Sequence, residues 1–95
     1  MYFQTITIPE NEELKCEPLK SFELDSSLFT SNDAAVYAAE YHAADYGGFY
    51  NPETPQKIRV VVIAPDDKTK VYTFESEFIV NQYDNEQLRF KLIKK

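Results

Sequence analysis

The sequence predicts an α+β fold: a mostly antiparallel β-sheet of four to five strands, with one main α-helix packed on one face. Stretches of alternating apolar and polar residues, typical of half-buried strands, occupy the start of the chain and most of its second half. One alanine-rich stretch lies between them, and Gly47 and Gly48 mark the change from helical to strand periodicity. Ninety-five residues suffice for one small core, so 1–95 is expected to form a single compact domain.

The N-terminal part of the chain is expected to be extended. Aromatic and β-branched residues alternate with polar ones over 2–8, and Pro9 ends this first strand. Two shorter candidates follow: 14–17, which Pro18 stops, and the weakly alternating 21–25.

The helix is expected over 32–46, because six alanines between Ala34 and Tyr46 give it high intrinsic propensity. The candidate N-cap residues are Ser31, Asn32 and Asp33. The glycine pair is expected to end the helix in a left-handed C-cap. A stripe of mostly small residues is expected to lie close on the sheet, namely Ala35, Val36, Ala39, Ala43 and Tyr46. The opposite side carries Tyr37, Glu40, Tyr41, Ala44 and Asp45.

Three strands are expected in the second half, after an irregular loop that contains two prolines. They are 57–64, which is nearly continuous Val and Ile, and the alternating segments 70–80 and 87–93. Residues 65–68 form a turn, because proline fixes its own φ and aspartates bond their own backbone. The expected core consists of Ile6, Ala39, Ala43, Val60, Val62, Phe74, Phe78, Leu88, Phe90 and Leu92.

No residue pattern for catalysis or for a cofactor emerges. With only two glycines the chain has no phosphate-binding loop. His42 and Cys16 are the only histidine and cysteine, too few for a zinc site. A cysteine between Lys15 and Glu17 is best interpreted as buried and structural. The paired acids fit loops, turns or a solvated strand face rather than a glycosidase cleft. We therefore expect a protein that is not an enzyme and that holds no cofactor and no metal.

Direct binding of nucleic acid is disfavoured. Arg89, Phe90 and Lys91 have the composition of a strand that stacks on nucleobases, but strand alternation places Phe90 on the opposite face from Arg89 and Lys91. The sequence pI of about 4.7 also opposes a phosphate-rich partner. No apolar run reaches the length of a membrane helix, and no signal segment opens the chain, so a cytoplasmic protein is the expectation.

The distribution of charge is the strongest functional hint. Residues 1–47 carry nine acids and two bases, whereas 48–95 carry seven acids and eight bases. Such asymmetry favours a face that meets a basic partner. Exposed tyrosines on the helix would anchor that contact, because tyrosine combines a large apolar area with a polar tip. The predicted partner-binding residues are Glu10, Glu12, Glu13, Tyr37, Glu40, Tyr41 and Asp45.

In size, acidity, lack of catalytic signatures and single alanine-rich helix, the chain resembles small phage-encoded proteins that block host defence, including anti-CRISPR proteins. The resemblance is one of type, and it assigns no functional residue. It implies a non-enzymatic inhibitor, in the host cytoplasm, that occludes a nucleic-acid-binding complex by steric and electrostatic means. The alternative is an assembly subunit that forms a homodimer through a sheet edge. A small enzyme that uses His42 is the third hypothesis.

Overall fold

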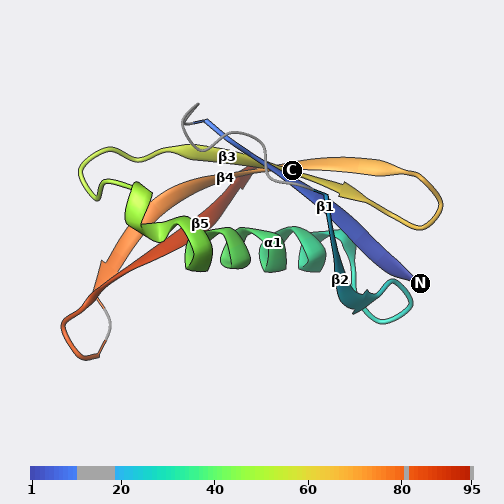
Figure 1. Ribbon diagram of the computed structural model, residues 1–95, viewed down its shortest axis with the longest axis horizontal. Helices are drawn as coiled ribbons and strands as arrows, with labels where there is room; N and C mark the ends of the chain where they lie inside the picture. Colours follow the sequence, from blue (N-terminus) through green and yellow to red (C-terminus); the bar gives the residue numbers. More distant parts are fainter. Residues whose placement is uncertain (11–18, 81, 95) are drawn as a thin grey trace.

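Five antiparallel strands form a twisted sheet, and one helix crosses one of its faces (Figure 1). The computed structural model describes residues 1–10, 19–80 and 82–94. The elements are β1 (Tyr2–Pro9), β2 (Lys20–Asp25), α1 (Ser31–Tyr46), the 3₁₀ helix η1 (Gly47–Phe49), β3 (Lys57–Ile63), β4 (Thr69–Val80) and β5 (Glu86–Lys94). The predicted α+β fold is therefore confirmed.

The strand order is β2-β1-β3-β4-β5, so β1 lies between β2 and β3 although the helix separates β1 from β3 in sequence. The second half of the chain forms a meander of sequential hairpins. Each expected strand and helix boundary agrees with the structure to within one residue wherever the structure describes it. The candidate strand at 14–17, with Cys16, lies outside the described residues.

The two faces of the sheet differ in burial because side chains alternate along each strand. The helix-covered face carries Phe3, Thr5, Thr7, Ile58, Val60, Val62, Tyr72, Phe74 and Ser76, all buried. Phe78, Leu88, Phe90 and Leu92 are partly buried against this core. The prediction of Ile6 as a core residue was wrong, because Phe3 and the two threonines fill the helix side of β1. Ile6 pairs with Val61 on the opposite face and is only half-buried.

The buried side of α1 is rotated relative to the expected stripe. Its buried residues are Ala34, Ala35, Ala38, Ala39 and His42. Val36, Ala43 and Tyr46 from the expected stripe are only half-buried. Alanines occur around much of the helix, so their pattern defines the contact face weakly. The fit of His42 into the core determines the rotation instead.

Both helix ends differ from expectation. The N-cap is Thr30, one residue before the candidates: its hydroxyl accepts a hydrogen bond from the Asp33 amide at 3.2 Å, and the Asp33 carboxylate accepts one from the Thr30 amide at 2.8 Å. This reciprocal pair is a capping box. At the other end, Gly47 has φ −55°, and the chain continues into η1. The left-handed glycine cap is therefore wrong.

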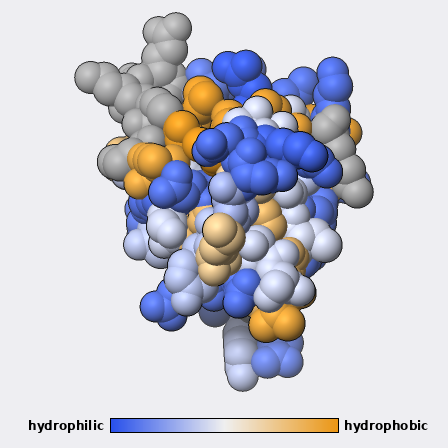
Figure 2. Space-filling model, turned by 90° about the vertical axis from the view of Figure 1, so that its right-hand side faces the viewer, coloured by the Kyte–Doolittle hydropathy of each residue, from blue (hydrophilic) through white to orange (hydrophobic). Residues whose placement is uncertain are grey.

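The β3–β4 turn follows the predicted chemistry. The Asp66 carboxylate accepts a hydrogen bond from the Lys68 amide at 3.2 Å, and the Asp67 amide donates to the Ala64 carbonyl at 2.9 Å. Asp67 adopts a left-handed conformation, with φ 66°. Figure 2 shows the end of the molecule near this turn, where hydrophilic residues dominate and hydrophobic ones form small groups between them.

Phe74 tests which face of β4 is buried, because its exposed fraction is 1% whereas that of Val71 is 48%. The Phe74→Ala variant is expected to lose about 3–5 kcal/mol of unfolding free energy, through lost burial and an unfilled cavity. The Val71→Ala variant should lose less than about 1 kcal/mol. Urea denaturation measures both, and equal losses would contradict the assigned faces.

Ala39 tests how closely α1 approaches the sheet. It is 1% exposed, so the extra atoms of an Ala39→Leu side chain have no room, and overpacking should cost about 1–3 kcal/mol. The matched control is Ala44→Leu, because Ala44 is exposed on the same helix. Thermal unfolding compares the two variants. An unchanged melting temperature for Ala39→Leu would show that the helix does not press on the sheet there.

Candidate functional site

The solvent side of α1 is acidic and carries no opposing charge of its own. The helix contains Asp33, Glu40 and Asp45 but no lysine or arginine. Because alanines and His42 occupy the buried side, these acids and the two tyrosines of the middle turns are exposed. The helix therefore presents negative charge and aromatic area together.

Tyr37 and Tyr41 rest on Phe22 of β2. The centroid of the Phe22 ring lies 4.9 Å from that of Tyr37, in an edge-to-face arrangement, and 5.7 Å from that of Tyr41. Contacts of this geometry favour fixed ring orientations. The two tyrosines nevertheless remain 47% and 43% exposed. They are thus held in place by the fold and still available for contact.

Lys20 at the start of β2 completes this group. Its Nζ lies 3.9 Å from the centre of the Tyr41 ring and 3.8 Å from Asp45 Oδ2. Such a surface ion pair contributes roughly 0–1 kcal/mol, so it serves mainly to position the side chains. We call Lys20, Phe22, Tyr37, Tyr41 and Asp45 the β2–α1 cluster.

The structure brings together only some of the predicted partner-binding residues. Tyr37, Tyr41 and Asp45 belong to the β2–α1 cluster, whereas Glu40 lies on the other flank of the helix, toward β5. Glu10 follows β1, and its side chain is directed to the sheet face opposite α1. The expected gathering of Glu10 with the helix acids is therefore not met. Glu12 and Glu13 lie outside the described residues.

Glu10 instead continues the hydrogen bonding between β1 and β3 just past the end of β1. Its amide donates to the Lys57 carbonyl at 2.8 Å, and its Oε2 accepts a hydrogen bond from the Lys57 amide at 2.9 Å. These two bonds extend the β1–β3 ladder beyond Pro9. Glu10 therefore has a structural contact that the sequence pattern did not indicate.

His42 lies inside the core. It is fully buried, and its Nε2 lies 2.6 Å from the hydroxyl oxygen of Tyr50, itself only 6% exposed. The rings of Tyr46, Tyr50 and Phe90 surround the imidazole at 4.9–5.7 Å between centroids. This arrangement satisfies a buried polar group and fixes the segment after α1 to the sheet.

Two ionisable groups near the start of α1 have shifted pKa values, and neither belongs to the β2–α1 cluster. Hydrogen bonds from the backbone amide of Ser27 and then from its hydroxyl lower the pKa of Asp25. Burial raises the pKa of Tyr72, against the smaller opposite effect of a hydrogen bond with Ser31. Both interactions help to fix the segment that leads from β2 into the helix.

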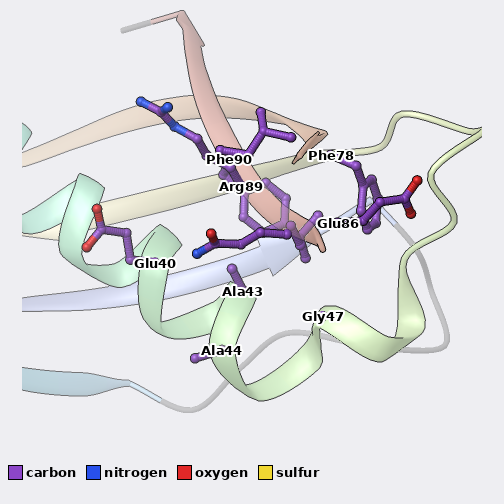
Figure 3. A pocket seen from close by; sticks show the side chains of 11 residues that line it. Glu40, Ala43, Ala44, Gly47, Phe78, Glu86, Arg89 and Phe90 are labelled. Atoms are coloured by element: carbon purple, nitrogen blue, oxygen red, sulfur yellow. The ribbon is translucent and has the colours of Figure 1, made fainter. Parts of the chain in front are cut away.

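A groove of about 720 Å³ separates the second half of α1 from the β4–β5 hairpin (Figure 3). The helix contributes Glu40, Ala43, Ala44 and Gly47, and the hairpin contributes Phe78, Ile79 and Glu86 to Phe90. His42 does not line it, although its ring packs on Phe90. Sequence reasoning missed this groove. Its signal was the run of small residues Ala43, Ala44 and Gly47 beside the partly buried strand side chains.

The described residues hold no group of three or more His, Cys, Asp or Glu side chains suited to a metal ion. No helix among them is both long enough and apolar enough to cross a membrane. Comparison of the chain with protein-family models, with curated proteins and with solved structures finds no match.

The Tyr50→Phe variant tests the buried pair. It removes one hydroxyl and leaves the histidine with one hydrogen-bond partner fewer in an apolar surrounding, so unfolding free energy should fall by about 1–3 kcal/mol. Tyr2→Phe is the control, because Tyr2 is 52% exposed. Chemical denaturation measures both variants. A loss below about 0.5 kcal/mol for Tyr50→Phe would show that the contact does not stabilise the fold.

Proposed function

We propose that the protein is a non-enzymatic binding protein that occludes a basic surface of a partner. The observation that carries this proposal is helix α1, which contains three acids and no basic residue and exposes two tyrosines held by Phe22, with Lys20 of β2 beside Asp45. The tyrosines supply desolvated anchor area, and the carboxylates supply attraction at longer range.

The partner class follows from the charge. Proteins that handle nucleic acids expose basic grooves for phosphates, and an acidic helix face is complementary to such a groove. The chain then acts as an inhibitor of a host nucleic-acid-binding complex, in the manner of the phage proteins that it resembles in size and composition. Inhibition is steric and electrostatic, so no catalytic group is required.

Two alternatives find less support. An enzyme that uses His42 needs its imidazole to reach a substrate, but the ring is fully buried and lines no described groove. An assembly subunit that pairs through a sheet edge has β5 available as an end strand. That strand carries Arg89, Lys91 and Lys94, which oppose pairing with a second copy.

The helix surface is tested by capture from a host lysate followed by kinetics on the purified partner. Wild-type protein should retain a basic protein, and duplex DNA should displace it. In surface plasmon resonance, Glu40→Lys with Asp45→Lys should slow association several-fold, with the effect reduced at high salt. Tyr37→Ala or Tyr41→Ala should speed dissociation about tenfold, which corresponds to roughly 1.4 kcal/mol.

Matched controls are Glu53→Lys and Tyr2→Ala, which alter an exposed acid and an exposed tyrosine away from α1. Both should bind as wild type does. If the helix variants also bind as wild type, without dependence on salt or DNA, the acidic half only confers solubility and the proposed function is wrong.

A further inference from the structure

β5 is an end strand with a groove beside it. In the order β2-β1-β3-β4-β5 it pairs only with β4, and no other strand among the described residues covers its outer side. An end strand presents backbone N–H and C=O groups that a further strand can pair with. The groove between α1 and the hairpin runs along this same edge, lined by Glu86 to Phe90 (Figure 3).

The side chains of β5 form two rows with different chemistry. Leu88 and Phe90 belong to the groove row, because they pair with the helix-facing Phe78 and Ser76 of β4. Arg89 and Lys91 belong to the opposite row, on the open face of the sheet, and Arg89 points away from α1 in Figure 3. Any strand added beside β5 continues this alternation, with one row in the groove and one on the open face.

We infer that the β5 edge and the adjoining groove bind an extended peptide segment of another protein, which adds a sixth strand to the sheet. A groove of about 720 Å³ falls within the size of ligand sites, roughly 300–1,000 Å³. Phe78, Leu88 and Phe90 give it an apolar part, and Ala43, Ala44 and Gly47 leave space for side chains beside Leu88 and Phe90. Main-chain hydrogen bonds supply affinity in this binding mode, and the pockets for alternate side chains supply specificity.

The charges define the segment. On the open face Arg89 and Lys91 have Glu77 and Glu75 of β4 on one side, and an added strand would lie on their other side. Acidic residues are favoured there, because they continue the alternation of charge across the strands. In the groove its side chains meet Phe78, Leu88 and Phe90 between Glu40 and Glu86, so apolar residues are favoured (Figure 3). Arg89 also lines the groove, but its guanidinium points away from α1. The occupant is therefore a strand that alternates apolar and acidic residues.

A second copy of this chain fits less well. When two β5 strands pair antiparallel in one continuous sheet, residues that lie directly opposite one another are on the same face. The two-fold axis that relates the two copies therefore passes beside one residue, which lies opposite the same residue of the other copy. An axis at Phe90 places Arg89 opposite Lys91 of the other copy, and an axis at Arg89 or Lys91 places that residue opposite itself. Like charges directly opposite are destabilising, so the registers with the greatest overlap are disfavoured.

The probes are three short fluorescein-labelled peptides with blocked termini, in which glutamate alternates with valine, with leucine or with phenylalanine. Fluorescence anisotropy should show saturable binding, and two-dimensional NMR should locate it on β5 amides and on residues 43–47. The same peptides with lysine in place of glutamate should bind at least tenfold more weakly. A peptide with its central backbone nitrogens methylated should not bind, because it cannot form the added ladder.

Two sets of variants separate the groove from the charged row. Ala44→Arg fills the groove from an exposed helix position and should weaken the glutamate peptide at least tenfold. Arg89→Glu with Lys91→Glu should reverse the preference, so that the lysine peptide binds better. Lys70→Glu is the charge control, because Lys70 is exposed at the far end of β4 and should leave binding unchanged.

Circular dichroism and thermal unfolding confirm that each variant is folded before binding is compared. The inference is overturned if none of the three glutamate peptides shifts β5 amides at millimolar concentration, or if the lysine and methylated peptides bind equally well. It is also overturned if the NMR signals of the β5 amides shift when the protein concentration alone is raised, since a second copy then occupies the edge.

Discussion

The close packing of the alanine face of α1 on the sheet is the contact on which the rest of the structure depends. Ala34, Ala35, Ala38 and Ala39 are almost fully buried against side chains from β1, β3 and β4. Small side chains allow the helix to approach the sheet closely, and His42 fixes its rotation through the bond to Tyr50. That rotation places Tyr37 and Tyr41 over Phe22 and leaves the groove on the other flank.

The same packing divides the surface into two electrostatic regions. The helix itself carries acids and no bases, with Lys20 of β2 beside Asp45, whereas the open sheet face carries opposite charges in cross-strand rows. Lys57, Glu75 and Lys91 lie opposite one another across β3, β4 and β5, and Glu77 lies opposite Arg89. Alternating signs in neighbouring strands are favourable, so this face is close to balanced.

Much of the fold was predictable because strand alternation and alanine content are local signals. The pairing of β1 with β3 was not, since no local pattern determines which distant strands meet. Hydrophobicity alone predicts the wrong buried face for β1, because Ile6 is more apolar than the buried Thr5 and Thr7, whereas register follows the fit of the whole strand. The sequence indicated that Tyr37, Tyr41 and Asp45 would share a region. The separate places of Glu10 and Glu40, and the groove, depend on tertiary geometry.

Native-state hydrogen exchange measured by NMR tests most directly whether α1 and the sheet form one cooperative unit. Amides in the middle of α1 and in β1, β3 and the first half of β4 are expected to exchange with the same free energy, close to that of global unfolding. The outer half of β5 and the segment before α1 should open at lower free energy. Exchange of the α1 amides at much lower free energy than those of β3 would contradict the claim that the alanine face holds the structure together.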